Sequence, residues 1–475
     1  MIELSSNIRS YILEHFGEYY LDQFLNYINQ PEQTYIRFTS SRFKEDGIKN
    51  RLSNYGIELL PVDGLPHAFK VVKGESVAGK TLDFILGTYY IQSLSSMIPA
   101  LLLSPDRNDK VLDLCAAPGS KTTQLAEMMG NKGTLIANEI SIDRLKSLIH
   151  NIDKMNLINV CVLQGKGELI SKSFNNYFDK TLVDAPCSAL GIIQKKNEVS
   201  NWWNEKKAKG LAEIQFKLLL SAIKACKVEG EIVYSTCTLS IEENELVLDK
   251  ILNKYPVELI DIELPVKSRE AITRYKNKEL NNSIKKARRI LPWEINSDGF
   301  FIAKFRKTAE LDSSIKSIDK KKNHFLNSQN IQIRKLLETL CEYFGIEYKY
   351  FEQYKFLIRN GGIYFANKEL EIDNPGIFVR IGSKLGLIDK KQFIQLHTLA
   401  AQTFGCYFTK NVIELNDVKD LEIYLNGGTI KKDFGTTGQK IVKWNNLIIG
   451  TASSSKEGLK SQLPRALRTQ TILLK

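Results

Sequence analysis

Hydrophobic and polar positions follow two alternating patterns along the middle of the chain. Between residues 76 and 307, short apolar runs typical of buried strands are separated by stretches whose apolar residues recur at helical spacing. Repeated strand–helix units predict an α/β domain with a Rossmann-like, doubly wound parallel sheet, which binds ligands at the carboxyl ends of its strands. The expected strands are Val111–Leu114, Gly133–Asn138, Val160–Gln164, Thr181–Asp184 and Gly230–Ser235, and the clearest helices are Ile142–Met155 and Leu211–Ala225.

The pattern predicts smaller units on both sides of this domain, which spans residues 76–307. Residues 1 to about 30 carry aromatic and apolar residues at helical spacing, and residues 1–75 as a whole predict an α+β extension of RNA-recognition-like shape, for which a purely structural addition is an equal alternative. Residues 308–330 are typical of a linker, and residues 331–475 predict a separate α+β, β-rich module. The extension should contain strands at Thr34–Phe38, Ile57–Val62 and Ala68–Val72 and a helix at Phe43–Tyr55.

The composition of the chain indicates which kind of partner the protein binds. The 475 residues carry a net charge of +12, and residues 331–475 hold 21 Lys and Arg against 14 Asp and Glu. This excess of positive charge favours a polyanion such as RNA. Seven cysteines at irregular spacing predict no disulfide framework, no metal-binding motif is present, and no apolar run is long enough to span a bilayer. We expect a cytoplasmic, monomeric protein that binds neither a metal nor a membrane.

The first strand of the α/β domain runs into a turn and then a helix, across Lys110–Thr122. Such a turn exposes backbone N–H groups at a helix N-terminus, where a carboxylate or phosphate binds. Glu139 ends the next strand, 20 residues after Gly119, where an acid binds ribose hydroxyls in such sheets; a solvated glutamate is the alternative. Gln164 ends the third strand and suits an adenine edge, although an ordinary loop glutamine is as good an interpretation.

Two cysteines and an aspartate lie at the ends of later strands. Asp184 and Cys187 belong to Asp184-Ala-Pro-Cys-Ser188, and Cys237 follows Cys187 by 50 residues in Tyr234-Ser-Thr-Cys-Thr238. A disulfide is unusual in the cytosol and a metal needs more ligands, which leaves thiolate chemistry or ordinary buried cysteines. C5 of a pyrimidine is too weak a nucleophile to take a methyl group directly. A thiolate that adds to C6 makes C5 reactive toward S-adenosylmethionine, and an acid at N3 assists.

With these residues the chain resembles the Sun (Nol/Nop) family of RNA (cytosine-5)-methyltransferases over about residues 30–307. The C-terminal stretch Leu459–Arg468 also resembles the end of the PUA-like RNA-binding module in bacterial ribosomal members. The matching motifs occur in the family's order: Tyr90-Ile-Gln-Ser-Leu-Ser-Ser-Met-Ile-Pro99, Asp113-Leu-Cys-Ala-Ala-Pro-Gly-Ser-Lys-Thr122, Asp184-Ala-Pro-Cys-Ser188, Tyr234-Ser-Thr-Cys-Thr238 with Glu242-Glu-Asn-Glu245, and Asp298-Gly-Phe-Phe-Ile-Ala-Lys304.

The resemblance implies a role for each of these residues. Cys237 is implied as the nucleophile that attacks C6, Cys187 as the group that aids breakdown of the adduct, and Asp184 as the contact to the cytosine. The chain departs from the family at three places: Ser120 replaces a glycine, Gln164 replaces an acid, and Ala189-Leu190-Gly191 replaces Gly-Glu-Gly. S-adenosylmethionine is expected on Cys115, Ala116, Ala117, Pro118, Gly119, Ser120, Lys121, Glu139, Gln164 and Asp184.

The target base must leave its stack to reach a thiol, so the protein needs a groove for single-stranded RNA. We interpret three basic regions as RNA contacts, with a solvated charged face as the alternative for each: Arg269–Arg289, Lys195-Lys196 with Trp202-Trp203, and the last forty residues. Three functions remain open. They are C5 methylation of rRNA, which the large C-terminal module favours, the same reaction on tRNA, and a non-catalytic RNA-binding ribosome-assembly factor.

Overall fold

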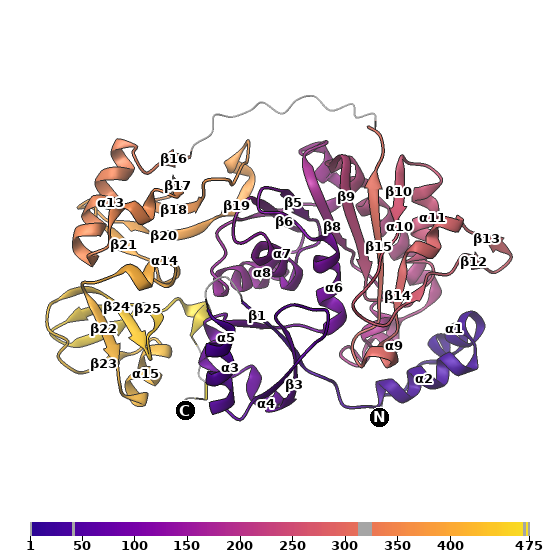
Figure 1. Cartoon of the computed structure of the whole chain (residues 1–475), viewed down its shortest axis with the longest axis horizontal. Helices are drawn as coiled ribbons and strands as arrows, with labels where there is room; N and C mark the ends of the chain where they lie inside the picture. The colour runs from indigo at the N-terminus through magenta and orange to yellow at the C-terminus, as the bar shows by residue number, and fades with distance from the viewer. Residues whose placement is uncertain (1, 40–42, 312–324, 469–471, 474–475) are drawn as a thin grey trace.

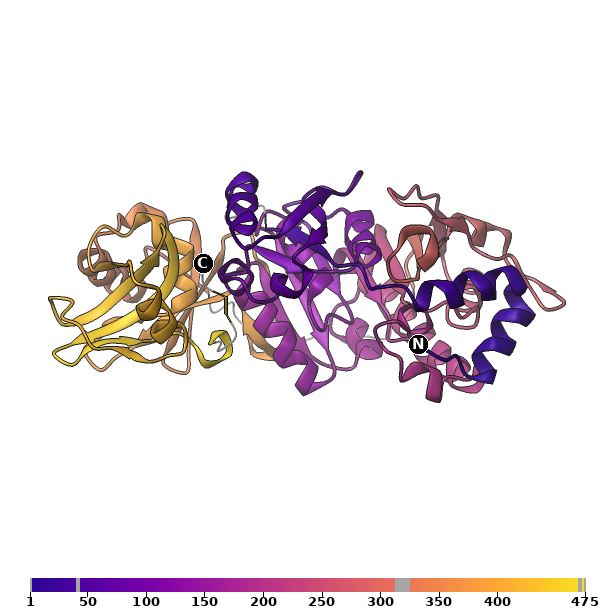
Figure 2. The same ribbon diagram turned by 90° about the horizontal axis from the view of Figure 1, so that it is seen from below.

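A ten-stranded sheet forms the centre of the molecule, and the N-terminal and C-terminal units flank it (Figure 1, Figure 2). The structure, a computed structural model, describes residues 2–39, 43–311, 325–468 and 472–473. No helix in these ranges is long and apolar enough to cross a membrane. In spatial order the strands are β11 (Arg269–Glu270), β14 (Arg288–Ile290), β15 (Phe300–Lys307), β9 (Cys226–Thr236), β8 (Phe178–Asp184), β5 (Lys110–Asp113), β6 (Thr134–Glu139), β7 (Val160–Gln164) and β19 (Phe378–Ile381), and β10 (Val257–Ile260) also pairs with β15.

The five strands from β9 to β7 are parallel, which confirms the predicted α/β fold. Strands β10, β14 and β15 are antiparallel to their neighbours, so the sheet is mixed and not parallel throughout. The chain turns back after β14 and enters β15 in the opposite direction. Such an antiparallel pair needs no crossover helix between its strands. An apolar run does not reveal the direction of its strand, and the sequence therefore did not predict this edge.

Helices cover both faces of the sheet. Val111 of β5 belongs to the apolar cluster formed with three helices on one face, whereas Leu112 belongs to the cluster on the other face. This division follows from the alternation of side chains along a strand, and it explains why the parallel strands are apolar at successive positions. The first face carries α6 (Leu94–Leu103), α7 (Ser120–Met128) and α8 (Ile142–Lys154), and the second carries α10 (Glu205–Ala225) and α11 (Glu245–Leu252).

The N-terminal residues form two separate structures. Helices α1 (Ser6–Phe16) and α2 (Glu18–Ile28) make a hairpin at one end of the catalytic domain, away from the small sheet that follows (Figure 1, Figure 2). That sheet has the order β2-β3-β1-β4, and its last strand extends past the boundary expected at residue 75 because it pairs with β1. Its elements are β1 (Tyr35–Phe38), α3 (Glu45–Asn54), β2 (Glu58–Pro61), β3 (Ala68–Lys73) and β4 (Tyr89–Ile91).

The C-terminal residues form an α+β unit with two five-stranded sheets, but this unit is not separate from the catalytic domain as expected. Strand β19 leaves the unit and pairs antiparallel with β7, so it completes the edge of the catalytic sheet. Arg380 on β19 donates to Asp153 Oδ1 at 2.9 Å and to the carbonyls of Val160 and Leu157 at 3.2 and 3.0 Å. Most of the expected linker, residues 312–324, lies outside the described residues.

The two C-terminal sheets are ordered β16-β17-β18-β20-β21 and β22-β24-β25-β26-β23. Three helices pack with them: α13 (Ile331–Phe344), α14 (Thr398–Phe404) and α15 (Val418–Leu425). The strands are β16 (Leu326–Asn327), β17 (Tyr354–Arg359), β18 (Gly362–Asn367), β20 (Ser383–Ile388), β21 (Ile394–Leu396), β22 (Val412–Leu415), β23 (Thr429–Ile430), β24 (Gly438–Trp444), β25 (Leu447–Ser455) and β26 (Gly458–Ser461).

Candidate active site

A turn of residues 114–119, the cofactor loop, connects β5 to α7 at the carboxyl edge of the sheet. Gly119 caps α7 with a φ of 110°, and an added Cβ would lie 3.0 Å from Leu148 Cδ1, so this position requires glycine. Ser120 is the first residue of α7 and has no positive φ, which explains why serine can replace the family's glycine there. The first N–H groups of α7 lack acceptors within the helix, and they suit the carboxylate of a bound cofactor.

Asp113 fixes the geometry at the start of this loop. Its side chain is buried, and its Oδ2 accepts a hydrogen bond of 2.6 Å from Thr122 Oγ1 of α7. Burial raises the pKa of the Asp113 carboxyl to about 7. Its other oxygen, Oδ1, has no hydrogen-bond partner among the described residues. The carboxyl therefore joins the strand end to the helix and keeps one acceptor free toward the loop.

Glu139 lies at the next strand end with its side chain buried, as expected for a residue that receives ribose hydroxyls. Its Oε1 accepts a hydrogen bond of 2.9 Å from Ser141 N, and its Oε2 lies 3.5 Å from Arg144 Nη1. Arg144 also donates to the carbonyl of Ala117 at 2.5 Å, so it connects the acid to the cofactor loop. We did not predict Arg144, although its place in the first turn after a strand end was a usable signal.

Asn138 is a second residue that the sequence reasoning missed. Its Nδ2 donates to the carbonyls of Leu114 and Gly165, at 3.0 and 3.1 Å, and so it ties together three strand ends. Gln164 pairs with Glu139 in the β6–β7 register, and its side chain is exposed at the edge of the sheet. The structure therefore brings Gln164 to the expected edge.

Cys187 and Cys237 meet at the ends of the adjacent parallel strands β8 and β9. Their Sγ atoms lie 3.2 Å apart although the residues are 50 positions apart in the sequence. Both are free thiols, as are the other five cysteines of the chain. The hydrogen bond between the two sulfurs, together with burial, raises the pKa of Cys187 well above its ordinary value. Two neighbouring thiols thus stand beside the cofactor loop without a covalent bond between them.

Lys121, just after the cofactor loop, and Asp184, at the end of β8, connect this loop to the segments that carry Cys187 and Cys237. Lys121 Nζ lies 2.8 Å from Asp184 Oδ2 and donates to Ser96 Oγ at 2.9 Å. Ser235 Oγ of β9 donates to Asp184 Oδ1 at 2.8 Å. Both oxygens of Asp184 therefore have partners, and 29% of its side chain remains exposed. Ser96 lies within the first of the motifs quoted above, which was the signal available for it.

Behind the thiols, Glu243 joins the two loops that carry them. Its carboxylate accepts hydrogen bonds from Ser188 N at 2.8 Å, from the Ser188 hydroxyl, and from Gln215 Nε2 at 2.9 Å. The Ser188 hydroxyl lies 2.9 Å from that of Thr238, the neighbour of Cys237. Burial raises the pKa of Glu243 to about 7. The motif of residues 242–245 thus supports both thiols from the protein interior.

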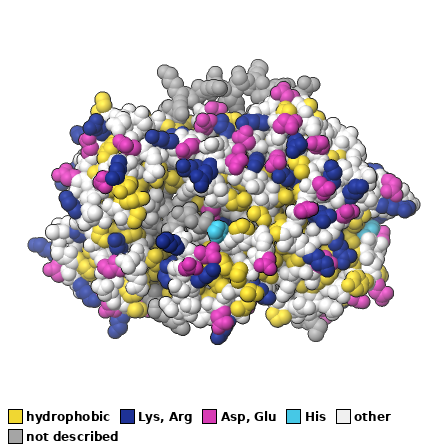
Figure 3. All heavy atoms as spheres, in the orientation of Figure 1, with side chains coloured by type: hydrophobic (Ala, Val, Ile, Leu, Met, Phe, Trp, Pro, Cys, Tyr) yellow, Lys and Arg dark blue, Asp and Glu magenta, His cyan; other side chains and the backbone are white. Residues whose placement is uncertain are grey.

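Part of the interpretation of basic regions as RNA contacts is wrong. Arg289 is buried and pairs with Glu245 at 2.5 Å, and Trp203 is also buried, so neither is available to RNA. Lys195 is exposed, and it pairs with Asp298 at 3.0 Å. In Figure 3, the Lys and Arg side chains on the visible face are interspersed with Asp and Glu and form no continuous band. Among the described residues, the exposed basic residues of the three expected regions are Lys195, Lys196, Arg269, Arg274, Lys276, Lys278, Lys285, Lys456, Lys460, Arg465 and Arg468.

Comparison with known proteins relates this site to characterised families. The profile of the family described as 16S rRNA methyltransferase RsmB/F matches residues 100–306. Among curated relatives, the ribosomal RNA small subunit methyltransferase F of Shewanella piezotolerans is 30% identical and covers 94% of this chain and 93% of its own length. The tRNA (cytosine(49)-C(5))-methyltransferase of Pyrococcus abyssi is 34% identical, over 60% of this chain and 92% of its own.

Solved structures agree with this assignment. A methyltransferase homolog protein from Pyrococcus horikoshii is 30% identical, has a TM-score of 0.56, and covers 62% of this chain and 92% of its own. NSun6 from Pyrococcus horikoshii with SFG is 24% identical, has a TM-score of 0.55 over 64% of this chain and 98% of its own, and supports the fold alone. Because a relative matches nearly the whole chain and the family profile covers the cofactor and thiol loops, the chain belongs to the RsmB/F family of S-adenosylmethionine-dependent methyltransferases.

Proposed function

We propose that this enzyme methylates C5 of a cytosine in rRNA through a covalent bond between Cys237 Sγ and C6 of the base. The observation that supports this mechanism best is the pair of free thiols, 3.2 Å apart, beside the cofactor loop. A C5 methylation needs one thiol to activate the ring, and a second polar group next to it helps to return the ring to its aromatic state. The two cysteines supply both groups.

The proposed reaction balances as follows. The Cys237 thiol passes its proton to water, and its sulfur forms a bond to C6 while the electron pair of the C5–C6 double bond moves to C5. C5 then bonds to the methyl carbon as the bond between that carbon and the donor's sulfonium sulfur breaks, which leaves a neutral thioether. S-adenosylmethionine, when bound, supplies this methyl group. The proton at C5 then passes to a base or water in the site, the C5–C6 double bond forms again, and the Sγ–C6 bond breaks. Cys187 aids this last step from its position next to Cys237.

We also propose which residues hold the substrates. The N–H groups at the start of α7 receive the carboxylate of the cofactor's methionine part, and buried Glu139 receives the ribose hydroxyls. Asp184, held by Lys121 and Ser235, contacts the amino and N3 edge of the cytosine. Gln164 at the end of β7 offers an amide to the adenine. The Asp113 Oδ1 atom without a partner fits a cofactor that supplies a donor there.

The length of the match favours rRNA over tRNA as the substrate. The small-subunit rRNA methyltransferases of Shewanella and Vibrio align with 94% and 98% of this chain, including the C-terminal unit. The archaeal tRNA enzyme aligns with only 60% of the chain, although nearly all of its own length is covered. The C-terminal residues are therefore shared with enzymes that are named for rRNA. We propose that the N-terminal sheet and the C-terminal unit bind this RNA.

The test uses the purified protein, labelled S-adenosylmethionine and total RNA from cells in which the gene is deleted, followed by mapping of 5-methylcytosine. We expect label in small-subunit rRNA; label in tRNA would replace the proposed substrate, and no label would refute the activity. Cys237→Ala should form no covalent protein–RNA adduct, and Cys187→Ala should accumulate one. Cys406→Ala removes an exposed thiol of the C-terminal unit and should behave as wild type. Full activity of Cys237→Ala would refute the assigned nucleophile.

Two further expectations extend the proposal. We propose that the protein works in the cytoplasm, because seven free cysteines, two of them in near contact, suit a reducing compartment. We also propose that it acts as a monomer that binds no metal. Light scattering coupled to size exclusion measures the molar mass, and a mass near 54.1 kDa is expected. Methylation that persists in the presence of a chelator would support the absence of a metal requirement.

A further inference from the structure

The helical hairpin α1–α2 packs against both loops that carry the proposed catalytic thiols. Its apolar side chains share one buried cluster with Ala189 and Leu190, which follow Cys187, and with Leu239, which follows Cys237. The hairpin lies outside the part of the chain that the family profile matches, residues 100–306. A segment from the very start of the described chain thus forms one wall behind the active site.

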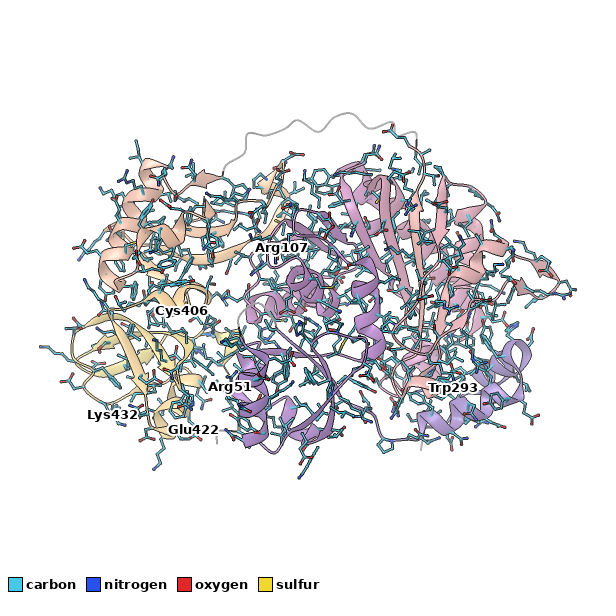
Figure 4. All side chains as sticks on the ribbon, in the orientation of Figure 1. Arg51, Arg107, Trp293, Cys406, Glu422 and Lys432 are labelled. Carbon is cyan, nitrogen blue, oxygen red and sulfur yellow. The ribbon has the colours of Figure 1, made fainter. Side chains whose placement is uncertain are left out.

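The hairpin is anchored at several points along its length. Trp293, labelled in Figure 4, contacts the side of α2 through an edge-to-face contact with Tyr20, with ring centroids 4.6 Å apart. Tyr27 near the end of α2 donates a hydrogen bond of 2.9 Å to the carbonyl of Ser297. These contacts hold the hairpin to the catalytic domain without touching the thiol loops. These contacts and the shared apolar cluster remain in place if one further contact is removed.

Tyr11 of α1 makes that further contact, and it differs from the others in its partners. Its hydroxyl accepts a hydrogen bond of 2.8 Å from Ile241 N and donates one of 2.7 Å to Glu242 Oε2. Both partners lie within five residues of Cys237, and Glu242 is buried. Burial and the charge of Glu242 raise the pKa of the Tyr11 hydroxyl well above its ordinary value, so the hydroxyl remains a donor. Its ring also packs edge-to-face on Trp203, with centroids 4.8 Å apart.

We propose that α1 is a working part of the active site and that Tyr11 is a positioning residue, which holds the loop bearing Cys237 in the geometry needed for attack on C6. This inference rests on the proposed function, because it takes Cys237 as the nucleophile. The loop of residues 237–244 has no helix or strand of its own, so its path depends on side-chain hydrogen bonds. Tyr11 supplies a donor and an acceptor at its centre from an element far away in the sequence.

The hydroxyl, and not the docking of α1, is the part of Tyr11 that this inference tests. Tyr11→Phe keeps the ring and its packing on Trp203 but leaves Ile241 N and Glu242 without this partner. Tyr27→Phe is the matched control: it removes one buried hydroxyl from the same hairpin, and the acceptor of that hydroxyl, the Ser297 carbonyl, belongs neither to residues 185–191 nor to residues 237–244. Leu13→Ala, at a residue 51% exposed on α1, controls for the purification and assay of surface variants.

We would measure kcat and KM for methyl transfer to RNA from gene-deleted cells, the Kd for S-adenosylmethionine, and the rate of adduct formation with 5-fluorocytosine-substituted RNA. Tyr11→Phe is expected to lower kcat and the adduct rate about tenfold, which corresponds to about 1.4 kcal/mol of transition-state stabilisation. KM and the cofactor Kd should remain within about twofold of wild type, since Tyr11 is buried and both partners of its hydroxyl are protein groups. Tyr27→Phe and Leu13→Ala should leave kcat unchanged.

The outcomes separate this inference from the proposed function. If wild type methylates RNA and Cys237→Ala does not, but Tyr11→Phe keeps the wild-type kcat, the positioning role of Tyr11 is refuted and the mechanism stands. An equal loss of kcat in Tyr11→Phe and Tyr27→Phe would also refute it, because the effect would then come from docking of the hairpin. If Cys237→Ala retains activity, the proposed mechanism fails, and the result for Tyr11→Phe cannot rescue it.

Discussion

Replacement of Arg289 by methionine should destabilise the protein and disturb the loop that carries Cys237. Arg289 donates to both oxygens of Glu245, at 2.6 and 2.5 Å, and to the carbonyl of Leu239 at 3.0 Å. The two charged side chains are 3% and 0% exposed, so water cannot replace either partner. Removal of one member of such a buried pair costs about 3 to 5 kcal/mol, because an uncompensated charge remains inside the protein.

Substitution of the partner, Glu245, tests whether this cost comes from the uncompensated charge. Glu245→Leu alone should be destabilising to a similar degree, since it leaves Arg289 buried and unpaired. In the double variant no charge remains, and the unpaired groups are the Leu239 carbonyl and Ile272 N, which otherwise donates to Glu245 at 3.1 Å. Orphaned backbone groups cost about 1 to 3 kcal/mol each. The double variant should therefore be more stable than the sum of the single effects predicts, by about 3 kcal/mol.

The assay is urea unfolding followed by tryptophan fluorescence, on the full chain, for wild type, both single variants and the double variant. The control is Arg334→Met, which removes an exposed pair with Glu338 at 2.7 Å and should leave the stability close to that of wild type, because exposed pairs contribute little. The double variant should regain stability but not methyl transfer, because the Leu239 carbonyl stays without its tether. A loss of unfolding free energy below about 1 kcal/mol for Arg289→Met, which is the range of an exposed pair, would refute the reasoning. Strictly additive effects of the two single substitutions would refute it as well.

Three further predictions concern the cofactor loop and the C-terminal unit. Asp113→Asn should gain stability relative to wild type as the pH rises from about 4 to 7, because the folded carboxyl has a pKa of about 7 and its ionisation in the buried site costs free energy. Melting temperatures of both proteins across this pH range measure the gain. A difference in melting temperature that stays constant with pH would contradict the prediction. Gly119→Ala should weaken S-adenosylmethionine binding, measured by calorimetry, about tenfold, since a left-handed φ costs about 1 to 2 kcal/mol for alanine. The control is Gly210→Ala, which has no atom near the added Cβ and should bind S-adenosylmethionine as wild type does. Arg380→Met should lower the melting temperature because it leaves the Leu157 carbonyl without its donor, at a cost of about 1 to 3 kcal/mol, whereas the Val160 carbonyl keeps Gly382 N as a donor. An unchanged melting temperature would show that β19 does not depend on this residue.

The catalytic core was predictable from the sequence because its signals are local. Five apolar runs mark the parallel strands, and the rule that parallel strands present their carboxyl ends at one edge places Cys187 and Cys237 at the same edge, where the structure has them. The same reasoning placed Asp184 and Gln164 at this edge, although their pairings with Lys121 and Glu139 are seen only in the structure. These outcomes depend only on strand order and direction.

The supporting contacts were not predictable, because they join residues without a shared local pattern. Arg289 lies in a basic stretch that is typical of a solvated face, and only the pairing of β14 with β15 brings it inside. The amphipathic pattern of α1 indicates a buried face but not its partner, so the contact of Tyr11 with Glu242 has no sequence signal. Strand β19 likewise resembles other short apolar runs, and its pairing with β7 depends on long-range contacts.

The pairing of β19 with β7 has a consequence for synthesis of the chain on the ribosome. Roughly 200 residues separate these strands, which at ordinary rates of translation corresponds to a delay of about 10 to 40 s. During this time the β7 edge of the nascent catalytic domain has unpaired backbone groups and is open to pairing with another chain. Completion of the C-terminal unit removes this hazard. The unit proposed to bind RNA is thus also the one that protects the newly made enzyme from aggregation.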